Sequence, residues 1–191
     1  MPYDKNSAIS KKKATADLAE LFKNYLYLIA GKKEFDQFFQ ALKKILEQGA
    51  DVNNAYVHPD IKETVLMYAA EYFPLPVVKL LVEYGADVNK KDDEGRTALM
   101  CAAYAGSLLD IRGNSAVVSF LIEHGADIEA EDNEGNTALF YGGCIKDVLD
   151  TLLKYNVNVH HKNHKGETAL EIAQEYCNDE MAHYLEKMMK K

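Results

Sequence analysis

The sequence predicts an all-α fold: a solenoid of about five helix-turn-helix pairs with β-turn fingers between them. Two phrases that recur in one register predict it. Copies of the first, Gly-Ala-Asp-Val-Asn, begin at Gly49, Gly85, Gly125 and, in degraded form, Asn156. Copies of the second, Thr-(Ala/Val)-Leu, begin at Thr64, Thr97, Thr137 and Thr168. The first two copies of the second phrase are 33 residues apart, and a repeated unit of that length is the signature of a stacked repeat protein.

The N-terminal part of the chain predicts a lead-in followed by a cap. Residues 1–13, which end in Lys11-Lys12-Lys13, are expected to be flexible and solvated. A cap over about 14–49 is expected because the end repeat of a solenoid has a neighbour on one side only. Two apolar stripes at helical spacing support this cap. They are Leu18, Leu21, Phe22, Tyr25 and Ile29, and then Phe35, Phe38, Phe39, Leu42, Ile45 and Leu46.

Three repeats follow, over about 50–85, 86–125 and 126–156, and a C-terminal cap repeat over about 157–191 completes a single domain, 14–191. Each second helix ends at a glycine, which suits the left-handed residue that follows a helix, and Asn156 is the next best residue there.

Two irregular stretches and the last helix complete the list of elements. Gly142 and Gly143 stand where earlier copies have alanine, so we expect a short or frayed first helix in that repeat. The surplus residues 108–114 are expected to form a surface loop between two helices, because loop closure costs little more as a loop lengthens. The last helix is expected over about Asp179–Met189.

The two phrases and their spacing resemble the ankyrin repeat over roughly residues 35–189. Where that family favours proline after the threonine, this chain has Val65, Ala98, Ala138 and Ala169. Where the family favours histidine, it has Met67, Met100, Phe140 and Glu171. The Thr–His hydrogen bond typical of the family is therefore unavailable. We expect apolar packing to replace it in the first three copies.

The resemblance implies a non-catalytic protein-protein interaction module that binds a protein partner on its concave face and finger loops. Contact residues are implied at three kinds of position. After the helical Ala-Ala they are Glu71, Tyr72, Tyr104, Glu175 and Tyr176. At the finger tips they are Asp93, Glu94, Arg96, Asn133, Glu134, Asn136, His164, Lys165 and Glu167. Before the glycine they are Tyr84, His124 and Tyr155.

The expected centre of this surface combines aromatic anchors and an acidic rim. Tyr72 and Tyr104 occupy nearly equivalent positions, so we expect them to be neighbours on the concave face. Glu94 and Glu134 are expected above them at successive finger tips. Such a surface suits a partner that carries Lys or Arg beside an apolar patch, because tyrosine is enriched at interface hot spots and opposite charge speeds association.

Composition limits the function classes. The net charge of −8 argues against nucleic acid as a partner, because phosphate binding needs clustered Lys and Arg. No apolar run is long enough to span a bilayer, and no signal peptide is visible. We expect a cytoplasmic monomer. Its three cysteines, an odd number, are expected to be free thiols in a reducing compartment: Cys101, Cys144 and Cys177.

Motif searches favour binding over catalysis. The chain has no glycine-rich phosphate loop, no Gly-x-Ser-x-Gly elbow and no Cys-His signature, and no cofactor is implied. Two alternatives to an adaptor stay open. The first is an inhibitor or immunity-type protein that blocks a basic enzyme or toxin. The second is a metal-binding protein that uses the histidine finger, His160, His161 and His164, although zinc would need a further converging ligand.

Overall fold

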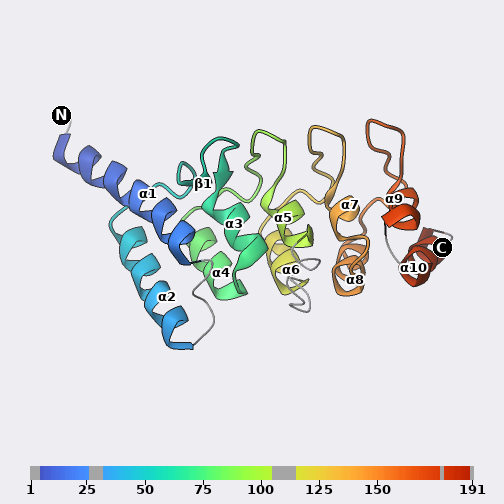
Figure 1. The fold of residues 1–191 in the computed structure, drawn as a ribbon, viewed down its shortest axis with the longest axis horizontal. Helices are drawn as coiled ribbons and strands as arrows, with labels where there is room; N and C mark the ends of the chain where they lie inside the picture. The colour runs from blue at the N-terminus through green and yellow to red at the C-terminus, as the bar shows by residue number, and fades with distance from the viewer. Residues whose placement is uncertain (1–4, 26–31, 105–114, 177–178, 190–191) are drawn as a thin grey trace. The chain divides into compact units, whose positions relative to one another are not determined.

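The computed structural model describes residues 5–25, 32–104, 115–176 and 179–189. The helices in these ranges come in five pairs (Figure 1), which confirms the predicted fold class. The pairs are α1 (Lys5–Tyr25) with α2 (Lys32–Glu47), α3 (Val65–Tyr72) with α4 (Leu75–Glu83), α5 (Ala98–Tyr104) with α6 (Ser115–Glu123), α7 (Ala138–Gly142) with α8 (Lys146–Lys154), and α9 (Ala169–Tyr176) with α10 (Asp179–Met189).

The chain divides into two compact units where the sequence predicts one domain. Unit 1 is Met1–Asp87 and unit 2 is Val88–Lys191.

The first helix of unit 1 is longer than the sequence predicts. Helix α1 begins at Lys5, so residues 5–13 are helical, and the expectation of a flexible lead-in is wrong for them. The side chains of residues 9–13 are nevertheless exposed, as expected of a solvated segment. The apolar stripe of α1 buries Leu18 and Phe22 completely. Phe22 packs edge-on against Phe38 of α2, with ring centroids 5.4 Å apart.

The first finger of unit 1 contains a short hairpin. Strands β1 (Tyr56–His58) and β2 (Glu63–Thr64) pair antiparallel, and α1 packs against β1. Thr64 then caps α3, because its side-chain oxygen accepts a hydrogen bond from the Met67 backbone N–H at 3.2 Å. Met67 is 1% exposed, so apolar packing occupies this position as predicted.

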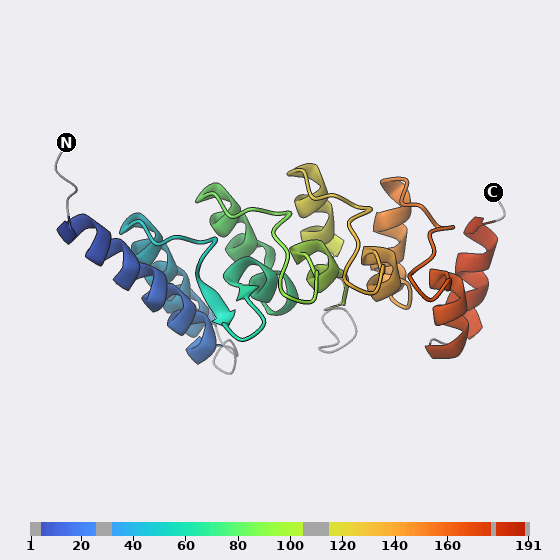
Figure 2. The same cartoon turned by 90° about the horizontal axis from the view of Figure 1, so that it is seen from above.

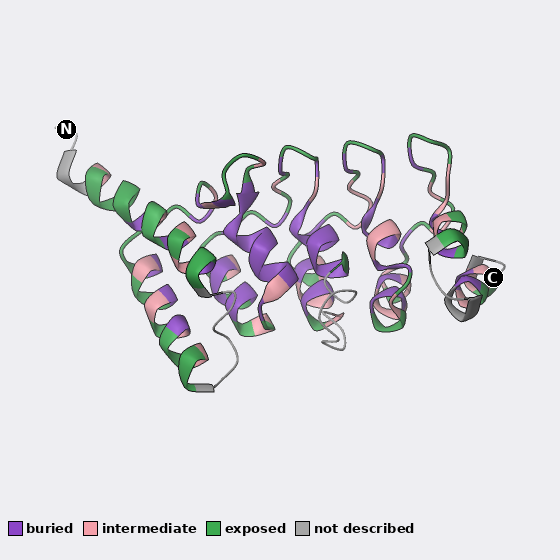
Figure 3. Ribbon diagram, viewed as in Figure 1, coloured by how far each residue is buried: buried purple, intermediate pink, exposed green. Residues whose placement is uncertain are grey.

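The helices of unit 2 form two layers. Helix α5 packs on α7 and α7 on α9, while α6 packs on α8, and Figure 2 shows α5 and α7 in one layer with α6 and α8 in the other. Helix α5 is buried along its length except for Tyr104 at its end, as Figure 3 shows. Helix α7 spans only five residues, which confirms the short helix predicted from Gly142 and Gly143.

The repeat boundaries follow the sequence pattern. Asn156 takes a left-handed φ of 59° after α8, where the other copies of the phrase have a glycine at positive φ. At the start of α9 a carboxylate replaces the family's histidine. Glu171 accepts hydrogen bonds from the Thr168 backbone N–H at 2.6 Å and from its hydroxyl at 2.9 Å, while the Glu171 N–H donates back to that hydroxyl. These bonds form a capping box.

The expectations for the cysteines, the last helix and the surface loop have different outcomes. Cys101 is a buried free thiol as predicted, but Cys144 is disulfide-bonded, so the expectation of free thiols is wrong for that residue. Helix α10 spans the predicted residues and buries Leu185 completely. The predicted surface loop at 108–114 lies outside the described residues.

Candidate protein-binding site

Each finger of unit 2 is held by one short polar side chain at its base. Oδ1 of Asp132 accepts hydrogen bonds from the backbone N–H groups of Glu134 and Asn136 at 2.7 and 2.9 Å. The same pair of backbone bonds is made by Asp92 and by Asn163 in the neighbouring fingers. This recurring turn fixes the shape of each finger tip.

Neighbouring fingers are also tied to each other. The Asn133 backbone N–H donates to the Glu94 carbonyl at 3.0 Å, and its side-chain amide donates to the Asp93 carbonyl at 2.8 Å. One finger further on, the His164 N–H donates to the Glu134 carbonyl at 2.8 Å. The three fingers of unit 2 therefore lie side by side as one continuous edge (Figure 1).

An acidic hollow of about 390 Å³ lies at two of these fingers. Its lining includes the carboxylates of Glu94, Asp132 and Glu134, together with the ring of Tyr141. Asp132 is 8% exposed, and the Tyr141 hydroxyl donates to its Oδ2 at 2.6 Å. Burial alone would raise the pKa of Asp132, but the hydrogen bonds from Tyr141 and Asn136 outweigh it and lower the pKa. Asp132 is therefore a carboxylate at the floor of the hollow.

The rim of the hollow is exposed and partly neutralised. The side chains of Glu94 and Glu134 are 60% and 65% exposed. Arg96 lies 3.2 Å from Glu94 but donates its shorter bond, 2.8 Å, to Asp92. Lys165 lies 3.7 Å from Glu134, and both side chains are largely exposed. Exposed pairs of this kind contribute little and exchange readily with a competing cation.

An aromatic pair borders the hollow. Tyr104, the last residue of α5, is 41% exposed. Its ring meets the Tyr141 ring edge-on, with centroids 6.4 Å apart. Tyr141 lines the hollow, and the exposed ring of Tyr104 extends this aromatic surface beyond it.

The structure brings several predicted residues together here and adds two. Glu94, Asn133, Glu134 and Asn136 line the hollow. Asp132 and Tyr141 were not predicted. Asp132 could have been found from its spacing, because an Asp or Asn stands four residues before Arg96, Asn136 and Glu167 alike. Tyr141 carries a weaker signal, because the equivalent position is Tyr68 in the first repeat but Cys101 in the preceding one.

Some predicted contact residues serve the fingers instead. The Arg96 guanidinium binds Asp92, and the Asn136 amide donates to Asp132 at 3.1 Å. Glu167 accepts from the Asn163 amide at 3.0 Å. Each of these three side chains bonds within its own finger. They therefore stabilise the shape of the finger, and those hydrogen-bonding groups are already occupied.

The remaining predicted residues of unit 2 are spread over other surfaces. The Tyr155 hydroxyl donates to Glu123 at 2.6 Å, and the His124 ring stacks on Phe120 with centroids 3.8 Å apart. Glu175 is exposed, whereas the side chain of Tyr176 lies outside the described residues.

In unit 1 the predicted residues differ in exposure. Glu71 is 9% exposed and is thus buried, so the expectation of a surface contact is wrong for it. Tyr72 is half-buried against Tyr68, with ring centroids 4.8 Å apart. Burial, together with its hydrogen bond to Glu71, raises the pKa of Tyr72 above its ordinary value. Tyr84, at 38% exposed, is accessible as predicted.

The three histidines of the last finger were the candidate metal ligands. In the described parts of the chain, no three His, Cys, Asp or Glu side chains are placed to hold an ion. Nε2 of His161 lies 2.9 Å from the Gly135 carbonyl oxygen, and the side chain is only 17% exposed, so it joins two fingers. The same described ranges contain no helix with the length and apolar character that a membrane crossing needs.

The comparisons with known proteins agree with this architecture. The family model described as ankyrin repeats (3 copies) matches residues 27–132 and 110–190. A curated rat protein, "Ankyrin repeat and SAM domain-containing protein 6", is 44% identical over 70 residues. A Plasmodium falciparum (isolate 3D7) protein, "Putative E3 ubiquitin-protein ligase protein PFF1365c", is 43% identical over 61 residues.

These two relatives are similar to part of the chain only. The matches cover 36% and 31% of this chain, and 8% and 1% of the rat and Plasmodium proteins. Their whole-protein functions are therefore not transferred by these matches. The family model, in contrast, covers most of the chain and agrees with the five helix pairs and the finger loops. The chain belongs to the ankyrin repeat family.

Proposed function

We propose that this ankyrin repeat protein is a non-catalytic interaction module that binds a protein partner through the acidic hollow and finger edge of unit 2. The observation that carries the proposal is the combination of three lining carboxylates with the aromatic pair Tyr104 and Tyr141 at their border. The partner would present an Arg or Lys side chain next to an apolar residue.

The chemistry of the site favours such a side chain. A guanidinium or ammonium that enters the hollow gains charge-assisted hydrogen bonds to Glu94, Glu134 or Asp132. An aromatic face within reach adds a cation–π contribution. The exposed ring of Tyr104 offers apolar area at low entropic cost, which is why tyrosine often anchors interfaces.

The charge of unit 2 favours a basic partner from a distance as well. Residues 88–191 contain 18 Asp and Glu against 11 Lys and Arg, so they carry −7 of the chain's −8. A field of one sign raises the association rate of an oppositely charged partner. An inhibitor of a basic enzyme or toxin would use the same surface as an adaptor. Loss of the bound enzyme's activity distinguishes the two.

Selection of a random peptide library on the full chain tests the proposal. Wild-type protein should enrich peptides with Arg or Lys beside an apolar residue. Tyr104→Ala should weaken binding of these peptides by about 1–3 kcal/mol, mainly through faster dissociation. Tyr84→Ala, a tyrosine of similar exposure in unit 1, is the control. Enriched peptides without basic residues, or equal losses in the two variants, would overturn the proposal.

Two further expectations concern the state of the protein. A monomer is proposed, and sedimentation equilibrium tests it. Cytoplasmic residence is proposed as well: the free Cys101 fits a reducing compartment, whereas the disulfide of Cys144 does not. Alkylation of thiols in unbroken cells, followed by mass spectrometry of the Cys144 peptide, decides this point.

A further inference from the structure

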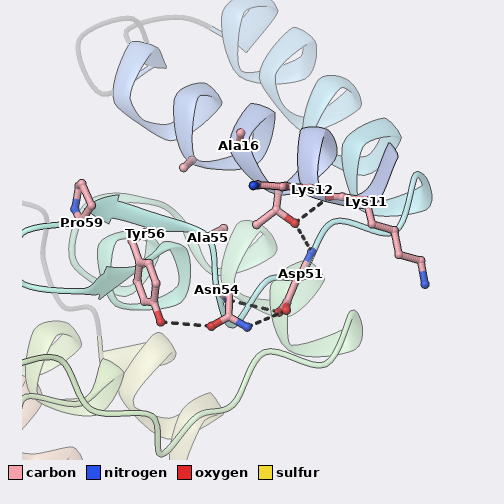
Figure 4. Close-up of a pocket in the computed structure, with 11 residues that line it drawn as sticks. Lys11, Lys12, Ala16, Asp51, Asn54, Ala55, Tyr56 and Pro59 are labelled. Carbon is pink, nitrogen blue, oxygen red and sulfur yellow. Dashed lines mark hydrogen bonds between the residues drawn. The ribbon is translucent and has the colours of Figure 1, made fainter. Parts of the chain in front are cut away.

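Unit 1 contains a groove that none of the predicted contact residues line. It measures about 580 Å³ and runs between α1 and the segment that leads into β1 (Figure 4). One wall comes from one face of α1, because positions 11, 15 and 19, and likewise positions 12 and 16, are about one turn apart on a helix. The other wall comes from the 49–59 segment, including Ala55, Tyr56 and Pro59.

The groove is preformed by hydrogen bonds at one end. The Thr15 hydroxyl donates to the Lys11 carbonyl and accepts from the Asp51 backbone N–H, both at 2.9 Å. Figure 4 shows how these bonds tie α1 to the opposite wall. The Tyr56 hydroxyl donates to the Asn54 side-chain oxygen at 3.2 Å, which orients the tyrosine ring along the groove.

The charges at this end are unbalanced. The Asp51 carboxylate accepts from the backbone N–H groups of Asn53 and Asn54 and from the Asn54 amide at 2.7 Å. These neutral donors leave the carboxylate charged, so the residues that line the groove include one acidic side chain against two basic ones. Lys11 and Lys12 also line the groove, both exposed. Among the described residues, neither ammonium forms an ion pair. The aliphatic stem of Lys11 lies against Gly49, which places the ammonium beyond the turn.

The two walls are apolar where they face each other and consist mainly of small side chains. Ala16, Ala19 and Ala55 supply methyl groups, and the Tyr56 ring and Pro59 continue them. From Lys11 to Ala19 the helix rises about 12 Å. An extended peptide covers that distance with about four residues. The groove therefore combines a positive end with a short apolar channel of peptide length.

We propose that this groove binds an acidic segment of a protein partner, with adjacent carboxylates at Lys11 and Lys12 and small apolar side chains over Ala16 and Ala19. Charge complementarity selects this occupant. This second site goes beyond the proposed function of unit 2 and has the opposite charge preference. It also gives a role to the run of three lysines, Lys11-Lys12-Lys13, that the repeat fold does not require.

The test uses the full chain labelled with ¹³C at the alanine methyl groups. The probe is a synthetic peptide with two adjacent glutamates followed by alternating alanine and leucine; its glutamine and lysine counterparts are the controls. The glutamate peptide should shift the methyl signals of Ala16, Ala19 and Ala55 and leave those of Ala98 and Ala173 in unit 2 unchanged. The glutamine and lysine peptides should bind at least about tenfold more weakly.

Matched variants locate the interaction. Lys11→Glu with Lys12→Glu should weaken binding of the glutamate peptide by at least about tenfold. Lys43→Glu with Lys44→Glu, two exposed lysines of α2 away from the groove, changes the net charge equally and should have little effect. Ala16→Phe should fill the groove and block binding, whereas Ala116→Phe at an exposed position of α6 should not.

Several outcomes would overturn the proposal. One is the absence of shifts at the three groove methyls with the glutamate peptide at millimolar concentration. Equal weakening by the two lysine pairs is another, because it would show only general attraction. Groove shifts that appear with phosphatidylserine vesicles or inorganic phosphate, but not with the peptide, would assign the lysines to another anion. The Tyr104→Ala variant should bind the glutamate peptide normally, which separates this test from that of unit 2.

Discussion

Thr137 shows what the loss of the family's histidine costs at one residue. Its side chain is completely buried. Within the described part of the chain, its hydroxyl is the buried side-chain polar atom that lacks a hydrogen-bond partner. Phe140 stands where a histidine would accept or donate that bond, and Phe140 packs edge-on to His161 instead, with centroids 6.0 Å apart. A buried hydroxyl without a partner is destabilising.

Thr137→Val should therefore stabilise the protein. Valine keeps the shape and removes the unsatisfied hydroxyl, so we expect the free energy of unfolding to rise by about 1 kcal/mol. Thr64→Val is the matched control, because the Thr64 hydroxyl caps α3 and its loss should cost about 1 kcal/mol. Urea unfolding of both variants measures the difference. Equal destabilisation by the two substitutions would contradict this reading of Thr137.

Tyr141→Phe tests the bond that holds Asp132 ionised. The folded-state pKa of Asp132 is lowered, so its stabilising contribution is present above the unfolded pKa of about 3.9 and is lost as pH falls through the folded value. Loss of the Tyr141 hydroxyl should cost about 1–2 kcal/mol at neutral pH, and the difference should shrink below about pH 4. Urea unfolding between about pH 7 and pH 3 measures it. A difference that grows toward acid pH would contradict the assignment.

At the scale of the finger, glycines at equivalent positions are required for different reasons. Gly135 and Gly166 have φ of 79° and 81°. A Cβ at Gly135 would lie 2.7 Å from Cδ2 and 2.8 Å from the backbone nitrogen of His164, whereas a Cβ at Gly166 would meet nothing within 4 Å. Gly135 is therefore required by both its conformation and the close approach of the next finger. Gly166 is required by its conformation alone.

Alanine at the two positions should separate these causes. Gly166→Ala should lower the free energy of unfolding by about 1 kcal/mol, the cost of a left-handed alanine. Gly135→Ala adds overlap with the next finger and should cost about 1–3 kcal/mol more. Urea unfolding of the two variants, compared with wild type, measures both losses. Equal losses would show that the fingers separate freely and do not form one edge.

Element boundaries were well predicted where a residue's backbone preference decides them. The double glycine shortened α7, and Asn156 ended α8, because both effects are local. The start of α1 was not predicted, because an exposed lysine-rich segment is helical only in some surroundings. Those surroundings include β1, which is far from the start of α1 in the sequence. The bond of Arg96 to Asp92 and the burial of Glu71 were not predicted for the same reason, because bonding partner and burial depend on the folded surroundings.

At the scale of the whole molecule, repetition made the fold predictable, whereas the basic partner stays a proposal that the charge of unit 2 supports. The five helix pairs follow from two phrases in register. The side-chain hydrogen bonds do not follow from them. Asp92, Asp132 and Asn163 occupy the same finger position, yet they bond to Arg96, Tyr141 and Glu167 respectively. The acidic hollow is the result of these individual pairings.

Charge reversal at the rim of the hollow should change association more than dissociation. Glu94→Lys with Glu134→Lys removes two exposed carboxylates and places cations at the rim. The association rate of a basic peptide selected on the wild type should therefore fall about tenfold at low ionic strength. Because salt screens exposed charges over about 10 Å at 0.1 M, the wild-type rate should fall steeply with salt while the variant's rate stays nearly flat. Glu83→Lys with Asp147→Lys, two exposed acids that do not line the hollow, changes the net charge equally. If stopped-flow measurements show the same slowing in this control, the attraction belongs to the chain's total charge and not to the hollow.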